Sequence, residues 1–295
     1  MRALIHWAAR NRGAVLFALL LGLGFTSATP GARAQASAIP SAQPGADLAN
    51  ADHGRKLLDQ MVAALGGDAW LNRTTWVEYG QTGHFYKGQP DPYVVGFEDY
   101  RRLSPYAERI VPVVHVSTLA ILGLPGRDHR DTATVWNAQG GWELTFKGKI
   151  EVPKEDEKEY QRVRSHALEV IVKDWLKRPD VTITDDGSMM VQRRLGEKVT
   201  VSVDGDSVVL ALDESNHLPL SLTFRYRDET YKDFDTETLE YDNYQPIEGI
   251  LTPMAVTRFK NGDTVSQRFL TKVEYKTALP AELFDPDAPL KQKTK

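Results

Sequence analysis

The amino-acid sequence predicts an α+β protein in which most residues belong to one antiparallel sheet. Apolar side chains recur at every second residue through most of the chain, which is the period of a strand with one buried face. Asp-Gly and Asn-Gly pairs separate several of these segments, and such pairs favour tight hairpin turns. Helical spacing occurs mainly in two segments. We therefore expect about 10–12 strands packed on an N-terminal helix and a long inserted helix.

Composition and charge exclude several classes of protein. Hydrophobic residues make up 41% of the 295 residues and charged residues 26%, as in globular proteins and unlike disordered or collagen-like chains. The chain has no cysteine, which excludes disulfides, thiolate metal sites and cysteine nucleophiles. The net charge is −4 and the sequence has no basic stripe, so we expect no nucleic-acid partner.

Residues 1–34 have the pattern of a secretory signal peptide. Arg2, Arg10 and Arg12 form a basic start, and 13–25 is a short apolar run. Ala32-Arg33-Ala34 has the small-x-small pattern of a cleavage site, and Ala34-Gln35-Ala36 offers a second choice. A membrane-spanning helix needs about 20 apolar residues, which favours cleavage over an uncleaved anchor. We therefore expect export by the general secretory route to the periplasm, or secretion, with no stable membrane span after cleavage.

Cleavage would leave an acidic chain with one folded domain. It removes four arginines, so 36 basic residues become 32 against 40 acidic residues, and the net charge becomes about −8. Residues 35–49 are rich in Pro, Ser and Ala and are expected to form a flexible linker. The domain is expected to cover residues 50–286, and 287–295 form a polar tail.

The first helix is expected from a cap at Asn50 or Asp52 to Gly66-Gly67, followed by one short turn at 68–71. Its apolar residues are spaced one, three and four apart and form one stripe: Leu57, Leu58, Met61, Val62 and Leu65. A glycine can end this helix because it adopts positive φ without strain.

The segments of period two are the expected strands. They cover residues 76–86, 93–103, 108–114, 132–146, 181–184, 189–195, 198–203, 207–212, 218–226, 236–244, 249–260 and 263–275. Tight turns are expected at 139–141, Asp186-Gly187, Asp204-Gly205 and Asn261-Gly262.

The Asn261-Gly262 turn predicts a register for the last hairpin. A two-residue loop would place Lys260 opposite Asp263, Met254 opposite Phe269 and Ile250 opposite Val273. That register gathers apolar side chains on one face, with Arg268, Lys272 and Glu274 on the other.

Two segments interrupt the strands. Residues 117–126 are short and almost wholly apolar, so they should cover either a core or a ligand. Residues 155–177 are expected to form one helix, with acids near its start, basic residues near its end and Pro179 after it. Its apolar stripe comprises Tyr160, Val163, Ala167, Leu168, Ile171, Trp175 and Leu176.

The order of motifs resembles the superfamily of periplasmic lipoprotein carriers, LolA and LolB, and their outer-membrane lipoprotein-sorting relatives. The motifs that carry the resemblance lie within about residues 50–286: Gly66-Gly67 after a helix, Gly80 and Gly83 in the first strand, Tyr100, Pro105 and Arg109, Trp136 and Trp142 around a hairpin, Asn216-His217-Leu218-Pro219-Leu220, Tyr241-Asp242-Asn243-Tyr244, Gly249-Ile250-Leu251-Thr252-Pro253, and Phe284-Asp285-Pro286. The resemblance implies an unclosed curved half-barrel around helices, with an apolar cavity for acyl chains. The chain differs by its greater length, its acidic 228–242 segment and its long 155–177 helix.

The leading hypothesis is a non-enzymatic protein that binds a lipid or an acylated lipoprotein, in a carrier or sorting role. The candidate cavity residues are Leu119, Ile121, Leu122, Ile171, Trp175, Leu222, Phe224, Met254 and Phe269. The same apolar residues also suit a solidly packed core without a cavity.

The sequence has no motif for a catalytic or metal site. A nucleophile elbow, a P-loop, a zinc-protease motif and a dinucleotide fingerprint are all absent after residue 34, so no catalytic residue, metal or cofactor is expected. His166 is expected on the surface, and the acids of 228–242 are expected to be solvated rather than to bind calcium.

Two other functions stay open. An envelope sensor of the same shape could bind a protein partner, with residues 228–242 as a contact. A hydrolase could use carboxylates that are dispersed in the sequence, because strands bring distant acids together.

Overall fold

The structure, a computed structural model, describes residues 44–116, 127–228, 230–276, 278–288 and 290. Its helices are α1 (Pro44–Leu65), α2 (Asp68–Asn72), α3 (Lys154–Ser165) and α4 (Leu168–Lys173), with short 3-10 helices η2 (Trp175–Lys177) and η3 (Ala281–Phe284). Its strands are β1 (Thr75–His84), β2 (Tyr93–Leu103), β3 (Tyr106–Val116), β4 (Arg127–His129), β5 (Thr132–Asn137), β6 (Gly140–Thr145), β7 (Gly148–Glu151), β8 (Thr182–Val191), β9 (Arg194–Val203), β10 (Asp206–Asp213), β11 (Pro219–Arg227), β12 (Phe234–Ile247), β13 (Ile250–Lys260) and β14 (Asp263–Lys276).

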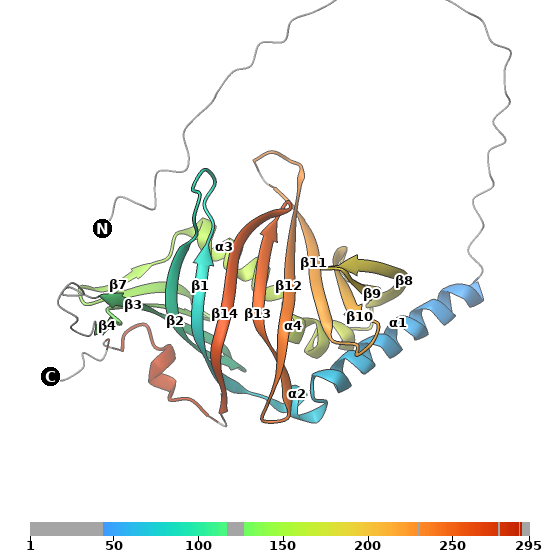
Figure 1. Cartoon of the computed structure of the whole chain (residues 1–295), viewed down its shortest axis with the longest axis horizontal. Helices are drawn as coiled ribbons and strands as arrows, with labels where there is room; N and C mark the ends of the chain where they lie inside the picture. The colour runs from blue at the N-terminus through green and yellow to red at the C-terminus, as the bar shows by residue number, and fades with distance from the viewer. Residues whose placement is uncertain (1–43, 117–126, 229, 277, 289, 291–295) are drawn as a thin grey trace, which may run out of the picture. The chain divides into compact units, whose positions relative to one another are not determined.

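The strands form one curved antiparallel sheet that does not close into a barrel (Figure 1). The 14 strands follow the order β7-β6-β5-β3-β2-β1-β14-β13-β12-β11-β10-β9-β8, with β4 paired to β3 off this path. The first and last strands of the chain, β1 and β14, are neighbours in the middle of the sheet. We call the face that packs against α1, α3 and α4 the inner face. The expected fold class is confirmed, with more strands than the sequence indicated.

Helix α1 begins at Pro44, so residues 44–49 of the expected linker are helical. Asn50 does not start the helix but joins it to the sheet: its amide donates to the Asp185 carbonyl at 2.7 Å and accepts from the Asp185 N–H at 2.8 Å. The end of the helix is as expected, because Gly66 and Gly67 adopt φ values of +124° and +54°.

The hairpin of β8 and β9 differs from the expected one. Asp186-Gly187 lies within β8 as a bulge, between Asp185 and Ser188, and the turn occurs at Gln192-Arg193, where both residues have positive φ. A bulge and a tight turn share a preference for Asp and Gly, which is why this pair was misassigned.

Two bulges in β14 change which side chains reach the inner face. Lys260 pairs with Asp263 as expected, but the register shifts by one residue after Phe259, so Phe269 lies opposite Ala255 and not opposite Met254. A second shift, on the β1 side, lies between Leu270 and Lys272. Since side chains alternate along a strand, the segment between the two shifts is reversed relative to the prediction. Phe269 is 51% exposed, whereas Arg268 points inward.

The expected helix 155–177 is broken at His166, giving α3, α4 and η2. His166 is buried, contrary to the surface position expected for it. Its ring stacks on Phe224 with centroids 4.1 Å apart, and its Nε2 lies 2.9 Å from a carboxylate oxygen of Asp206. The break therefore turns an aromatic ring into the core and fixes where α3 ends.

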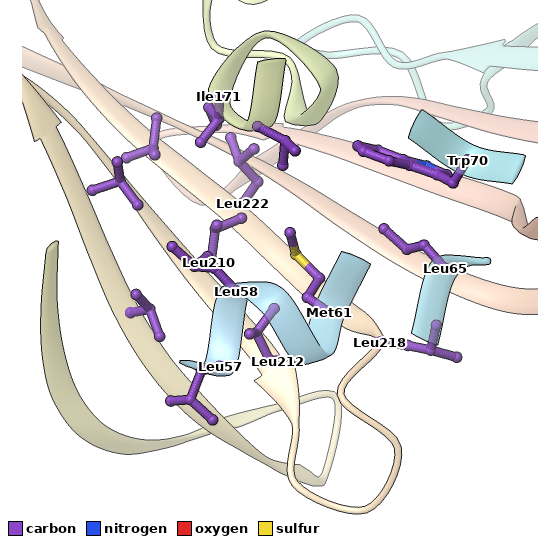
Figure 2. Close-up of a cluster of buried hydrophobic side chains, with 14 of the residues drawn as sticks. Leu57, Leu58, Met61, Leu65, Trp70, Ile171, Leu210, Leu212, Leu218 and Leu222 are labelled. Carbon is purple, nitrogen blue, oxygen red and sulfur yellow. The ribbon is translucent and has the colours of Figure 1, made fainter. Parts of the chain in front are cut away.

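The main core lies between α1, α4 and strands β9–β11 (Figure 2). Leu58 and Met61 of α1 point toward Leu210 and Leu222 of the sheet, while Ile171 of α4 approaches from above. Among the described helices, none is long and apolar enough to cross a membrane.

Truncation in this core tests the packing. Leu222 is fully buried, so Leu222→Ala should lower the free energy of unfolding by about 2–5 kcal/mol through lost apolar burial and a residual cavity. Leu195→Ala, at an exposed site on β9, is the matched control and should change it by less than about 0.5 kcal/mol. Urea denaturation measures both. Equal losses in the two variants would contradict this packing.

Candidate functional site: a cavity under helix α3

A cavity of about 410 Å³ lies between the inner face of the sheet and helices α3 and α4. One part of its wall is apolar and includes Leu65, Trp70, Trp76, Leu239, Ile250, Leu251 and Leu270. The other part is charged and comprises Arg73, Glu78, Arg101, Glu108, Arg164, Glu169, Arg258 and Arg268. The cavity is therefore amphipathic, whereas the sequence had predicted an apolar one.

Three carboxylates and two guanidinium groups form a buried network at the β1–β2–β3 end of the cavity. Arg268 donates to Glu78 at 2.5 Å and to Asp99 at 2.7 Å. Arg101 lies 2.8 Å from both Asp99 and Glu108. Alternation along neighbouring strands places these side chains on one face, since Asp99 pairs with Glu78 and Arg101 with Glu108 in the register.

Burial and an excess of carboxylate change the protonation of Asp99. Burial is the largest cause and, together with the carboxylates of Glu108 and Glu78, outweighs Arg101 and Arg268, so that the pKa of Asp99 is raised to about 7. Burial would also raise the pKa of Glu78, but Arg101 and Arg268 outweigh it and hold the value at about 2. A proton on Asp99 thus balances the network. Its Oδ1 is buried and has no hydrogen-bond partner among the described residues.

Helix α3 is held over the cavity by polar and aromatic contacts. None of its twelve residues, all described, is buried. The Tyr160 ring stacks on Trp136 with centroids 3.9 Å apart, and its hydroxyl donates to Glu108, which also accepts from Tyr106 at 2.9 Å. The charged network and the helix are therefore joined through Glu108.

A second ion pair links α3 to the middle of the sheet. Arg258 lies 2.6 Å from Glu159 of α3 and 2.7 Å from Glu237 of β12. Glu237 is buried, so the expectation of solvated acids throughout 228–242 is wrong at this residue. Its position beside Arg258 explains how a carboxylate can be buried there.

Beside α4, three cations lie near the carboxylate of Glu169. Glu169 lies 3.8 Å from Arg73 and 4.0 Å from Arg164, both longer than a hydrogen bond. Lys173 donates to the carbonyl of Arg73 at 3.5 Å. Burial lowers the pKa of Arg73, which is consistent with a cation held away from water.

The sequence-predicted cavity residues lie elsewhere. Leu119, Ile121 and Leu122 fall outside the described residues. Ile171, Leu222 and Phe224 belong to the main core, Trp175 packs against that core, and Met254 packs with Trp76 and Val273. None of these described residues, and not Phe269 either, is part of the cavity wall. Their role in binding a ligand stays a prediction.

The charged wall was missed because sequence alternation alone did not mark it. One face of β2 carries Phe97, Asp99 and Arg101. The sequence signal for the charged wall was therefore a pair of opposite charges two residues apart, next to an aromatic residue. Arg268 carried no such signal, because the bulges of β14 decide its direction. Within the described part of the chain, no group of three or more His, Asp or Glu side chains is arranged to hold a metal ion.

The network predicts opposite pH behaviour for two neighbouring carboxylates. Because the pKa of Asp99 is raised above its usual 3.8, the folded chain holds a proton there that the unfolded chain releases, and this stabilisation is lost as the pH rises toward 7. Asp99→Asn should remove that loss. The difference in unfolding free energy between this variant and the wild type should therefore shift by about 2 kcal/mol in favour of the variant between pH 5 and 7.

Glu78→Gln is the matched control. The pKa of Glu78 is lowered to about 2, so its stabilisation is present above about pH 4.5 and lost only as the pH falls toward 2. Glu78→Gln should therefore cost stability at every pH between 5 and 8, and this cost should vary with pH only because the pKa of Asp99 is lower without the neighbouring carboxylate. Denaturant titrations at several pH values give both differences. A flat difference for Asp99→Asn would show that Asp99 is ionised throughout.

Comparison with known proteins identifies the fold. No protein-family model matches the chain, and no curated protein matches it in sequence. An outer membrane lipoprotein-sorting protein domain from Vibrio parahaemolyticus aligns at a TM-score of 0.53 and 10% identity, over 80% of this chain and 97% of that one. A DUF1329 family protein from Desulfovibrio piger aligns at 0.53 and 11% identity, over the same shares. A LolA superfamily protein from Nitrosomonas europaea aligns at 0.46 and 10% identity, over 79% and 97%.

Identities of 10–11% carry information about fold alone. The chain shares the fold of the outer membrane lipoprotein-sorting domain, which confirms at the level of fold the resemblance identified in its sequence.

Proposed function

We propose that the protein binds a lipid, or an acyl chain of a lipoprotein, in the cavity under α3. The observation that carries this proposal is the cavity itself, which a packed core would not leave. Its wall includes Trp70, Trp76 and Leu251, which offer an acyl chain an apolar surface. Burial of each methylene contributes about 0.8 kcal/mol before ordering costs.

The volume favours one chain over several. Small-molecule cavities range from about 300 to 1,000 Å³, and 410 Å³ is near the lower limit. We infer a binding protein or carrier without catalytic activity, acting in the periplasm. The signal-peptide pattern of residues 1–34 and the fold shared with a lipoprotein-sorting domain support this proposal.

Native mass spectrometry with lipid extraction tests the proposal. The exported chain, purified from a bacterial periplasm without detergent, should carry one acyl lipid per chain or take one up on incubation with phospholipid. An unliganded mass that stays unchanged after incubation would contradict lipid binding.

Two neighbouring residues of β14 give a matched pair for the site. Leu270 lines the cavity and Phe269 faces outward. Leu270→Glu should abolish lipid uptake because it places a charge against the acyl chain, whereas Phe269→Glu should leave uptake unchanged. Circular dichroism checks the fold, and Leu239→Gln is the milder variant if Leu270→Glu fails to fold. Loss of uptake only in Phe269→Glu would move the site to the outer face.

A second candidate function is an envelope sensor that binds a protein partner through residues 228–242. Tyr231 is 83% exposed and Phe234 is also exposed, beside the carboxylate of Asp233. Such aromatic side chains are enriched at interfaces. A partner that stays bound after delipidation, and is released by Tyr231→Ser with Phe234→Ser, would support this function. Retention by the double variant would contradict it.

A further inference from the structure

We propose that the cavity selects a single-chain amphiphile with an anionic oxygen head group, a carboxylate or a phosphate, and that Arg164 and Arg73 bind this group. The inference rests on the proposed function, because it assigns the chemistry of the ligand in the same cavity. It goes further by giving the head group a position and a charge.

Two of the guanidinium nitrogens of Arg164 are buried donors without an acceptor. Its Nε and Nη1 are inaccessible to solvent and have no hydrogen-bond partner in the part of the chain that the structure describes. Its guanidinium lies over the ring of Tyr106 at 3.8 Å, so that its donors stay close to the wall of the cavity. A buried guanidinium without acceptors is costly, and an anionic oxygen is its strongest partner.

Arg73 presents a second guanidinium near the first. Its planar group lies 4.0 Å from the centre of the Trp70 ring, and one nitrogen donates to the Trp70 carbonyl at 2.5 Å. Its other terminal nitrogen lies 3.8 Å from Glu169, too far for a hydrogen bond. Arg73 and Arg164 thus flank one carboxylate without binding it closely, and both can turn to a ligand oxygen.

The side chains around Glu169 carry a net positive charge. Arg73, Arg164 and Lys173 face the single carboxylate of Glu169, and burial together with Arg73 lowers the pKa of Lys173. The carboxylate network lies close by, because Tyr106, over which Arg164 lies, donates to Glu108. The three cations around Glu169 would attract an anion.

The apolar wall fits the remainder of the ligand. Trp70 lies under Arg73, and Leu65, Trp76, Ile250 and Leu251 complete the apolar part of the same wall. A head group at the arginines would leave an acyl chain against these residues. Binding would thus pair the charge and bury the chain in one step.

The experiment compares anionic and neutral amphiphiles of equal chain length on the delipidated, exported chain. Palmitate, palmitoyl lysophosphatidic acid and monopalmitoylglycerol are titrated at pH 8, below their micelle concentrations, with tryptophan fluorescence as the readout because Trp70 and Trp76 line the cavity. We expect the anionic ligands to bind about tenfold more tightly or better. The better of the two anions identifies carboxylate or phosphate as the head group.

Arg164→Gln should weaken binding of the anionic ligands by about tenfold or more and leave the neutral ligand unchanged. Arg162→Gln is the matched control, because Arg162 lies on α3 but stacks on Tyr226 at 3.6 Å and is not part of the cavity wall. Glu169→Gln should tighten binding of the anions, since it removes the competing carboxylate. A purely structural role for Arg164 would lower binding of all three ligands together.

The outcomes separate this inference from the proposed function. Equal affinity for anionic and neutral ligands would overturn the anionic subsite and leave lipid binding intact. Selective binding of anions that Arg164→Gln does not change would overturn the assignment to this residue. Failure of all three ligands to bind would overturn the proposed function itself.

Discussion

The inner face of an open, curved sheet has to be covered, and this protein covers its two halves by different means. Over β9–β11, α1 and α4 bury leucine, isoleucine and methionine side chains in a close-packed core. Elsewhere on the inner face, α3 buries none of its own described residues and is held instead to β3 through Tyr160 and Arg164 and to β13 through Glu159. Directional polar contacts hold a helix without filling the space beneath it. The cavity lies between the close-packed core and the part of the sheet that α3 covers.

The polar half depends on the geometry of β14. Between its two bulges the strand turns Arg268 and Leu270 inward and Phe269 outward. Arg268 then bridges Glu78 of β1 and Asp99 of β2, and Arg101 continues the network to Glu108 under α3. Gly80 lets β14 pass this close, because a Cβ there would lie 2.1 Å from the Phe269 carbonyl oxygen. The bulges of β14 thus place Arg268 where it joins the charged network of β1, β2 and β3.

The sequence predicted correctly those structural features that depend on neighbouring residues. The turns at Asp204-Gly205 and Asn261-Gly262, the end of α1 and the antiparallel character of the sheet follow from residue type and alternation. The bulges could not be predicted, because one extra residue in a strand leaves the apolar pattern readable in either register. The break at His166 was likewise hidden, since its buried position depends on Phe224 and Asp206, which are distant in sequence. The cavity wall depends on both features, and so its residues were missed.

Stability alone does not explain the buried charges. Replacing a buried ion pair with apolar groups of similar size is often neutral or stabilising, so such a network is weak evidence for stability. Here the network has one carboxylate more than it has guanidinium groups, and it holds that excess only by raising the pKa of Asp99 to about 7. The cavity wall thus has charged side chains on one part and apolar side chains on another. A wholly apolar lining would hold an acyl chain equally well but could not orient it, whereas the unpartnered nitrogens of Arg164 give the proposed anionic head group one place to bind.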